Sequence, residues 1–452
     1  MAEQKSMHGL WRSRWLFILA ATGSAVGLGN IWKFPYITGE NGGGAFVLVY
    51  LACICLIGIP VMIAEVTLGR LGRQSPINTM HALVKDQGVP KFWGGIGWMG
   101  AVAGFLILSF YSVVAGWSLA YVFRMAGGAF DGATGESVGG IFSDLLSNPE
   151  ALLGWHTIFM VLTIGIVARG VNKGLEKAIS VLMPLLFLIL LLLLGYSLST
   201  EGFGAGFEFL FSFDFSKINR ESIIVALGHA FFTLSLGMGA IMAYGAYMPQ
   251  KASVGKTVLM VAGLDTLIAL IAGLVIFPIV FSNGLEAGAG PGLLFQTLPL
   301  AFSQMPAGTL FGTLFFLLVA FAALSSAISL AEPVVAWAVE SKGMSRASAA
   351  SWIGIVIWAL GIGSLLSFNL WSDYTLFGKT FFDSLDFLTA NILLPLGGLL
   401  IAIFVGWMMH QKDVEQEVRM ESPVMYNVWR FVLKFIAPVA VAIVLINGLI
   451  PA

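Results

Sequence analysis

Asp265 places a carboxylate inside an apolar stretch, VAGLDTLIALIAG. An ionisable group in a membrane-length apolar segment is costly, so it is treated first as a functional group. Ser325 and Ser326 lie in a second stretch of this kind. Carboxylate, hydroxyl and carbonyl oxygens are the ligands that hard cations prefer. The serines also have a structural interpretation, in which each hydroxyl bonds the carbonyl one turn earlier in a helix.

Two glycine-rich interruptions break apolar segments, GSAVGLGN at 23–30 and FTLSLGMGA at 232–240. Each glycine weakens a helix by about 1 kcal/mol, and an unpaired backbone group in lipid costs several kcal/mol. A cation can bind the freed carbonyls, and a carboxylate can bind the amides at a half-helix N-terminus. The alternative is close helix packing through small residues, and the spacing of Gly23 and Gly27 fits it.

The elements that position these residues must be membrane helices. Of the 452 residues, 58% are hydrophobic and 10% are charged, against about 45–50% and about 25% in soluble domains. The net charge of −1 excludes a nucleic-acid surface, and the apolar runs are too long for barrel strands. Cys53 and Cys55 are expected to be inert, without a metal or a disulfide. No cleavable signal peptide is expected.

Eleven apolar segments are long enough to span a bilayer. Basic residues gather in every second loop, which predicts a cytoplasmic N-terminus and an extracellular or periplasmic C-terminus in a bacterial inner membrane. The stretch 284–303 is expected to be a partly apolar external loop or re-entrant helix pair. The segments are roughly 14–37, 43–69, 94–123, 152–169, 175–198, 222–247, 255–282, 308–339, 347–368, 384–409 and 427–450.

The two glycine-rich breaks fall in segments one and six, which are equivalent places in two five-helix halves. Paired interrupted segments at corresponding positions are typical of the binding site of a secondary transporter. We therefore expect one transmembrane transporter domain over residues 1–452 and no soluble domain. Helices 1–5 (about 14–198) would form a first repeat, helices 6–10 (about 222–409) a second, and helix 11 (about 427–450) would follow them.

Two long motifs of the chain resemble helix signatures of the neurotransmitter:sodium symporter family. GSAVGLGNIWKFP at 23–35 is similar to the first-helix signature and FFTLSLGMGAIMAYGAY at 231–247 to the sixth. The resemblance covers essentially the whole chain and is strongest to the bacterial eleven-helix branch that carries multiple hydrophobic amino acids. It implies an all-α polytopic protein with the leucine-transporter fold, an inverted five-helix repeat and broken helices 1 and 6. The implied function is Na⁺-driven symport of amino acids by alternating access.

The resemblance also implies two sodium sites. The first would use the Ala25 carbonyl and the side chains of Asn30, Thr233 and Asp265, completed by the substrate carboxylate. The second would use the carbonyls of Gly23, Val26 and Ala322 and the hydroxyls of Ser325 and Ser326.

Asp265 and Ala269 differ from the pattern of many family members, which have Asn and then Ser at these positions and bind chloride nearby. A fixed carboxylate supplies the negative charge that chloride otherwise brings, so we expect chloride-independent transport. A buried carboxylate that has lost its sodium prefers the neutral form, which is consistent with proton counter-transport.

The substrate site implied by the resemblance has an apolar side-chain end, and Gly27 stands where monoamine carriers have Asp. Both features favour a hydrophobic or aromatic α-amino acid, and a flexible Met238 accommodates several sizes. The tolerance of Met238 and Leu330 for bulk would distinguish this substrate from a small or polar one such as glycine or taurine. The expected substrate-binding residues are Ala25, Leu28, Gly29, Ile107, Tyr111, Phe232, Thr233, Ser235, Met238, Ser326 and Leu330.

Charged and aromatic residues at the two ends match the gates of the family. Lys33 and Asp386 would pair outside, where Lys replaces the usual Arg and cannot make a bidentate pair. Trp11, Tyr247 and Glu340 match the inner gate, with His8 in place of the usual Arg and Lys5 or Arg12 as substitutes. Glu65 is expected to support the broken backbones, and His229 replaces a common Gln.

Gly174 and Pro184 bracket nine residues of helix 5, a pattern that in the family resembles a segment that unwinds to open the second sodium site. The alternative is that Gly174 and Pro184 only mark the start of an ordinary helix.

A transporter-like channel or sensor is a competing function. A channel needs a polar pore, and a sensor needs a signalling domain. No enzyme is expected, because HExxH, GxSxG and paired catalytic carboxylates are absent from the sequence. The expected partners are the amino acid and the lipid bilayer, without nucleic acid or an obligate protein partner.

Overall fold

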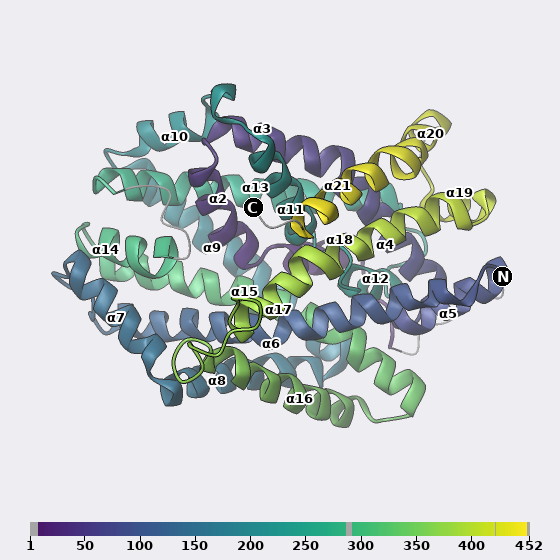
Figure 1. Ribbon diagram of the computed structural model, residues 1–452, viewed down its shortest axis with the longest axis horizontal. Helices are drawn as coiled ribbons and strands as arrows, with labels where there is room; N and C mark the ends of the chain where they lie inside the picture. The colour runs from purple at the N-terminus through teal and green to yellow at the C-terminus, as the bar shows by residue number, and fades with distance from the viewer. Residues whose placement is uncertain (1–7, 286–291, 421, 450–452) are drawn as a thin grey trace.

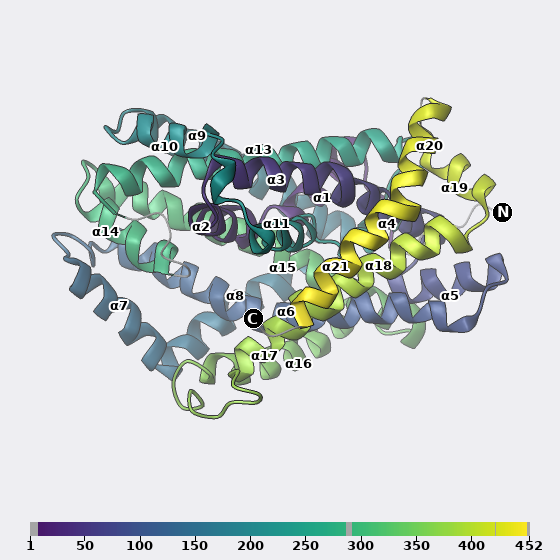
Figure 2. The same ribbon diagram turned by 45° about the horizontal axis from the view of Figure 1, so that its top comes forward.

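The computed structural model describes residues 8–285, 292–420 and 422–449. Within these ranges the chain forms helices, and strand pairing is limited to one isolated bridge between Leu376 and Lys379. Most long helices run along the long axis of the molecule (Figure 1). Short helices α7, α10 and α14 gather at one end, and the N-terminus, α5 and α19 at the other (Figure 2).

The first half of the chain forms the following helices, where η marks a short π- or 3-10-helical stretch. They are α1 (Arg14–Ala25), η1 (Gly29–Lys33), α2 (Phe34–Glu40), α3 (Gly44–Cys53), η2 (Ile54–Gly58), α4 (Ile59–Gly72), α5 (Pro76–Gln87), η3 (Lys91–Gly94), α6 (Gly95–Ala126), α7 (Gly135–Ser147), α8 (Pro149–Val167), η4 (Val171–Glu176) and α9 (Lys177–Leu198).

The second half begins with a short connection and then repeats the pattern of long helices. Its elements are α10 (Phe203–Phe211), η5 (Phe215–Lys217), α11 (Arg220–Thr233), α12 (Ala240–Ala246), α13 (Val254–Ser282), η6 (Leu293–Thr297), α14 (Leu298–Ser303), α15 (Gly308–Lys342), α16 (Arg346–Leu366), α17 (Phe381–Phe387), η7 (Leu388–Leu393), α18 (Leu394–Ile403), η8 (Phe404–Met408), α19 (Gln411–Val418), α20 (Pro423–Phe431), η9 (Val432–Ile436) and α21 (Ala437–Leu449).

Nine helices among the described residues are long and apolar enough to cross a membrane. A tenth crossing is the pair Arg14–Ala25 and Gly29–Glu40, whose halves meet at a bend of 53°. The remaining expected segment, 222–247, is divided into α11 and α12, and each half alone is too short to span. The arrangement is therefore consistent with eleven crossings. Of the expected loop at 284–303, residues 286–291 lie outside the described residues, and the rest is a single helix, η6 with α14, rather than a helix pair.

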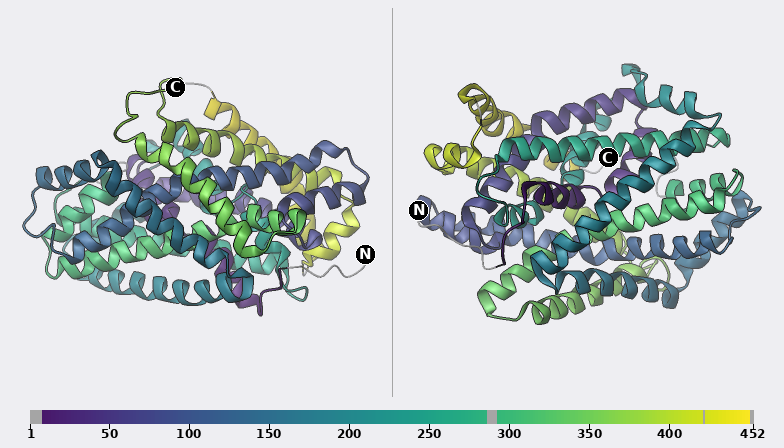
Figure 3. Two further views of the ribbon diagram at one scale, coloured as in Figure 1. Left: turned by 90° about the horizontal axis from the view of Figure 1, so that it is seen from below. Right: turned by 180° about the vertical axis from the view of Figure 1, so that it is seen from behind.

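The two broken segments lie inside the bundle. α1 packs against α9, α12, α13 and α15, and its purple ribbon is surrounded by later helices when the molecule is seen from behind (Figure 3). α12 packs closely on α4, because Gly245 lies against the Val66 backbone, where a Cβ would be 2.7 Å from the carbonyl oxygen. α6 and α15 pack along each other. The contacts of α1 and α12 therefore place both breaks inside the bundle.

The cysteines face different surroundings. Cys53 is buried and Cys55 is exposed, and both are free thiols. This matches the opposite directions expected of positions i and i+2 on a helix.

Candidate functional site

The first break begins where α1 ends at Ala25. Val26 is extended, and the helix resumes at Gly29 as a π-helical turn. Between them, the amide of Gly27 donates to Asn30 Oδ1 at 3.2 Å, and the amide of Leu28 donates to Tyr111 Oη at 3.4 Å. Both donors are buried, so the freed backbone groups are satisfied by side chains rather than by solvent.

The second break separates α11 from α12 by a turn with three left-handed residues, Ser235, Gly237 and Gly239. The left-handed conformation of Ser235 is stabilised by its side chain, because the hydroxyl donates to the Ser24 carbonyl in the first break at 2.9 Å. Glu65, which is fully buried, accepts from the Gly237 amide at 3.1 Å. The structural support expected of Glu65 is therefore present for the sixth-helix break.

The carboxyl group of Asp265 lies at the junction of the two breaks. It accepts from Asn30 Nδ2 at 2.7 Å and from the Thr233 hydroxyl at 3.1 Å, and its side chain is fully buried. Among the described residues, no Lys, Arg or His forms an ion pair with it. A buried carboxylate needs a compensating positive charge, so this donor set fits a bound cation. The Asn30 oxygen faces Gly27 here, and coordination through that oxygen requires the amide to turn.

Ser326 forms a second group of oxygens one helix away. Its hydroxyl lies 3.4 Å from the Gly23 carbonyl, 3.1 Å from that of Ser24 and 3.2 Å from that of Val26. Ser325 donates to the Ala322 carbonyl one turn earlier in α15 at 3.0 Å, the bond that the structural interpretation of the serines expects. A Cβ on Gly23 would lie 3.4 Å from Ser325 Cβ, so the backbone of α1 touches α15 at this point. The five residues expected for a second sodium site are thus brought together, with oxygen donors of the kind that hard cations prefer.

A small cavity lies beside Ser326 and the first break. Its open volume is about 20 Å³, which is room for about one water molecule. Thr233 is the one residue expected at the substrate site that does not line it, because that side chain is turned to Asp265. Ser24 and Gly27 line it in addition. The complete lining is Ser24, Ala25, Gly27, Leu28, Gly29, Ile107, Tyr111, Phe232, Ser235, Met238, Ser326 and Leu330.

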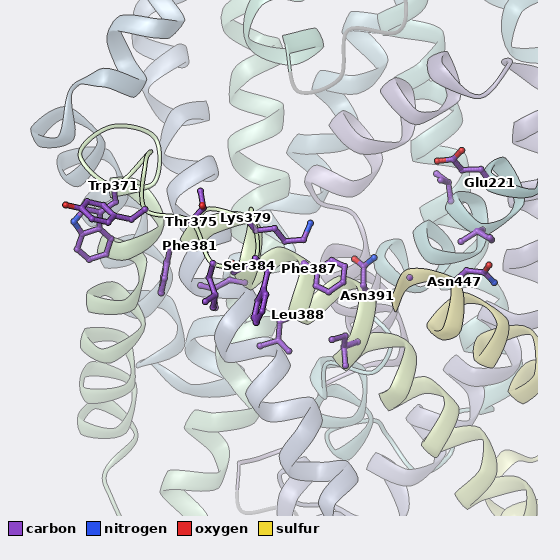
Figure 4. Close-up of a pocket in the computed structure, with 18 of the residues that line it drawn as sticks. Glu221, Trp371, Thr375, Lys379, Phe381, Ser384, Phe387, Leu388, Asn391 and Asn447 are labelled. Atoms are coloured by element: carbon purple, nitrogen blue, oxygen red, sulfur yellow. The ribbon is translucent and has the colours of Figure 1, made fainter. Parts of the chain in front are cut away.

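A much larger cavity lies elsewhere. It has a volume of about 1580 Å³ and is bordered by the start of α11, the loop before α17, α17 with η7, and the end of α21. Trp371 lies at one end of it, and Glu221 and Asn447 lie at the other (Figure 4). None of the residues expected to bind ions or substrate lines this cavity, so its size does not identify the site.

At the end of the site that is expected to face outward, Lys33 takes a partner other than the one expected. Its amine lies over the Phe232 ring, 4.9 Å from the centroid, a cation–π contact. No ion pair joins Lys33 to Asp386 in the part of the chain that the structure describes. The positive charge thus covers the aromatic wall of the small cavity.

At the end that is expected to face the cytoplasm, the residues expected to form a gate are in contact. The Trp11 amide donates to the Tyr247 carbonyl at 3.0 Å, and His8 Nε2 is 2.9 Å from Glu340 Oε1. Arg12 does not replace His8 at Glu340 but pairs with Glu176 at 3.3 Å. Lys5, the other substitute considered, lies outside the described residues. The N-terminal segment is therefore held against both α15 and the start of helix 5.

Three charged residues at this same end were not predicted from the sequence. The Tyr247 hydroxyl donates to Glu332 at 2.7 Å, and Glu332 is fully buried and bound by Arg346. Glu176 also accepts from Asn172 at 3.1 Å. Glu332 could have been found from the sequence, because it is a second carboxylate in an apolar helix, six residues after Ser326.

The fifth transmembrane helix, η4 with α9, does not begin as a regular α-helix. Gly174 lies in the π-helical stretch η4, and Pro184 lies inside α9. Met183, next to this proline, packs at Gly23 of the first break, where a Cβ would be 2.9 Å from its sulfur.

His229 is buried beside Phe34 and Tyr50, at ring separations of 6.0 and 5.4 Å. Neither of its ring nitrogens has a hydrogen-bond partner among the described residues.

The chain is similar to known proteins over nearly its whole length. A model of the Sodium:neurotransmitter symporter family matches residues 8–129 and 147–452. A sodium-dependent transporter of Bacillus subtilis, YhdH, is 40% identical over 99% of this chain and 98% of its own. A sodium-dependent transporter of Haemophilus influenzae is 33% identical over 99% and 100%.

The structure is similar to the crystal structure of MhsT in complex with L-phenylalanine. The TM-score is 0.90 at 46% sequence identity, covering 97% of this chain and 99% of MhsT. This match confirms the leucine-transporter fold that the resemblance implied.

Proposed function

Because the chain belongs to the sodium:neurotransmitter symporter family, we propose that it imports hydrophobic and aromatic L-amino acids in symport with Na⁺. The family is one of membrane transporters rather than of enzymes. The observation that carries the choice of substrate is the small cavity beside Ser326 and the first break, walled by Ile107, Phe232, Met238 and Leu330. The likeness to MhsT, crystallised with L-phenylalanine, supports it.

The carboxylate of the amino acid meets the amides of the first break and the Tyr111 hydroxyl, with one Na⁺ between it and Asp265. Sodium is part of the cargo here, bound by Ala25, Asn30, Thr233 and Asp265. The substrate carboxylate completes its shell, so each cargo improves the binding of the other. A second Na⁺ is held by Gly23, Val26, Ala322, Ser325 and Ser326. It joins α1 to α15 at the place where the helix is broken.

Alternating access depends on the contacts that close each end of the transport path. Inside, the Trp11–Tyr247 and His8–Glu340 contacts close the path. Release requires these contacts to separate and the first half of helix 5, between Gly174 and Pro184, to unwind. In the described structure Lys33 lies over Phe232. In another state of the cycle, Lys33 and Asp386 pair and close the outer vestibule.

Asp265 makes transport independent of chloride in this proposal, because a fixed negative charge replaces the anion and Ala269 offers no hydroxyl. Once Na⁺ has left, a proton neutralises Asp265 on the return step, which gives proton antiport. The whole chain forms one transporter domain in the inner membrane of a bacterial cell, with the N-terminus in the cytoplasm and the C-terminus outside.

A small amino acid such as glycine is a second candidate, favoured by the volume of about 20 Å³ in the cavity. Met238 argues for the larger substrate, since an unbranched thioether side chain adapts its shape. Binding of radiolabelled leucine, tryptophan, tyrosine and glycine to purified protein, in Na⁺ or K⁺ and with or without chloride, separates the two. Na⁺-dependent, chloride-independent binding of the large amino acids supports the proposal. Selective glycine binding refutes its substrate, and a chloride requirement refutes the role of Asp265.

A further inference from the structure

The loop that joins α16 to α17, residues 367–380, exposes a group of large apolar side chains. Tyr374 is 74% exposed, Leu376 is 65% exposed and Phe377 is 95% exposed. Trp371 is exposed in the same loop. Single exposed apolar side chains are common on proteins, but a group of them marks a surface that contacts a partner or a membrane. We call this segment the aromatic loop.

The tip of the aromatic loop is a tight turn that presents Phe377. Leu376 and Lys379 exchange two backbone hydrogen bonds, of 2.8 and 3.1 Å, around Phe377 and Gly378. Both central residues have a positive φ, 52° and 75°, as a type I′ turn requires. Asn is the usual first residue of such a turn, and a bulky residue avoids this backbone region. Local preference therefore does not explain the aromatic side chain at the tip.

The base of the aromatic loop is fastened to the helices on both sides of it. The Ser367 hydroxyl accepts from the Phe382 amide at 3.0 Å and donates to the Gly363 carbonyl at 3.0 Å, which joins the end of α16 to the start of α17. Thr380 caps the first turn of α17. The exposed tip thus stands on a fixed base.

The aromatic loop lies where membrane-spanning helices end. The spanning helices Arg346–Leu366 and Phe381–Met408 flank it, and the Asn369 amide donates to the Leu146 carbonyl at 2.8 Å, just before the spanning helix Pro149–Val167. In Figure 2 the loop is the lowest part of the view, on the flank of the bundle, while α7, α10 and α14 form the left end. The left view of Figure 3 also shows it projecting from the flank. It therefore extends sideways at the depth where interfacial Trp and Tyr are enriched.

The space beside the aromatic loop also lies on the flank of the bundle. This is the large cavity of Figure 4, and Trp371 and Phe377 border it. On the helix formed by α17 and η7, Ser384 and Leu388 line the cavity, whereas Asp386 between them does not. Positions two apart on a helix point to different sides. Since Asp386 is the residue expected in the vestibule, the cavity lies on the other side of this helix, toward the bilayer.

We propose that the aromatic loop inserts its tip into the lipid bilayer at the boundary between headgroups and acyl chains. Phe377 and Leu376 lie below the headgroups, and Tyr374 lies among them, since a phenol has an apolar ring and a polar end. Under the orientation proposed above, this is the outer leaflet. The loop carries one acidic and one basic residue, Asp373 and Lys379, so it recognises the apolar interior of the leaflet and not the charge of a headgroup. The contact depends on neither the amino acid nor the ion that is carried.

Spin-label accessibility in vesicles measures the depth of the tip. The full-length protein carries a nitroxide at Phe377→Cys, with Cys53→Ala and Cys55→Ala as the background, in phosphatidylcholine vesicles. Oxygen concentrates in the bilayer, and nickel ethylenediaminediacetate stays in water. Glu136→Cys, exposed in α7, is the water reference, and Val356→Cys, exposed in the middle of α16, is the lipid reference. At Phe377, collisions with nickel should be several-fold fewer and collisions with oxygen several-fold more frequent than at Glu136.

A second variant tests whether the apolar tip causes the insertion. A label at Tyr374→Cys should gain several-fold in nickel collisions when Leu376→Ser and Phe377→Ser are added, while the label at Val356→Cys should not change. Nickel collisions at Phe377 equal to those at Glu136 would place the tip in water and overturn the proposal. Shielding of Phe377 from both reagents, as in packing against protein, or dipolar broadening from a second copy of the chain would overturn it as well. So would a Tyr374 label that the two serines do not affect.

Discussion

Replacement of Ser326 by alanine tests the second sodium site with a single atom. The hydroxyl lies 3.1–3.4 Å from three carbonyls of the first break, those of Gly23, Ser24 and Val26. A hydrogen bond or polar contact with a charged partner contributes about 1.5–3 kcal/mol. Since 1.4 kcal/mol is a factor of ten in affinity, Ser326→Ala is expected to weaken Na⁺ binding about 10- to 100-fold.

The assay is thermal unfolding of the purified protein against NaCl concentration at constant ionic strength, with KCl as the balancing salt and no amino acid present. A ligand that binds only the folded state stabilises it in proportion to the logarithm of its concentration over the dissociation constant. The stabilisation curve of Ser326→Ala should therefore move to higher Na⁺ by the same 10- to 100-fold.

Ser329→Ala is the matched control. This hydroxyl lies one turn further along α15 and bonds the Ser24 hydroxyl at 2.7 Å and the Ser326 carbonyl at 2.8 Å, but none of the carbonyls of the break. Its Na⁺ curve should stay within about twofold of wild type. A Ser326→Ala curve that does not move, or a Ser329→Ala curve that moves as far, refutes the assignment of Ser326 as a sodium ligand.

Three further changes probe other parts of the site. Asp265→Asn removes the fixed charge and should weaken Na⁺-dependent amino-acid binding at least tenfold, and chloride should not restore it. Equilibrium binding in chloride and in gluconate salts measures this, and full binding in both salts would contradict the role of the carboxylate. Gly27→Ala places a methyl group 2.5 Å from the Ser326 hydroxyl oxygen, so it should reduce leucine binding more than 100-fold while the protein still unfolds cooperatively; wild-type affinity would show that the substrate lies elsewhere. His8→Ala breaks the 2.9 Å contact with Glu340 and should raise inward-facing accessibility, measured as faster hydrogen exchange in residues 8–25; unchanged exchange would argue against a gate.

The sequence predicted the centre of the molecule better than its ends. Asp265 was recognisable because a carboxylate in an apolar segment must have a partner, and the partners expected by resemblance, Asn30 and Thr233, are in contact with it. The breaks were predictable because glycine-rich stretches stand at equivalent places in the two halves of the chain. The exact backbone turn was not, since the left-handed Ser235 depends on a bond to Ser24 far away in sequence.

At the ends, long flexible side chains have several possible partners, and sequence spacing does not rank them. Lys33 was expected to reach Asp386 and lies over Phe232 instead. Glu332 and Arg346 were not paired in advance, because their contact depends on how α15 and α16 pack. Arg12 found Glu176 for the same reason.

The central claim is that sodium movement drives amino-acid uptake through this protein. Purified protein in liposomes, given radiolabelled leucine with an inward Na⁺ gradient, should accumulate it above the outside concentration. The accumulation should vanish when K⁺ replaces Na⁺ or when a sodium ionophore collapses the gradient, and it should persist without chloride. Uptake that is equal in Na⁺ and K⁺, or that stops at the outside concentration with the gradient intact, would contradict the account.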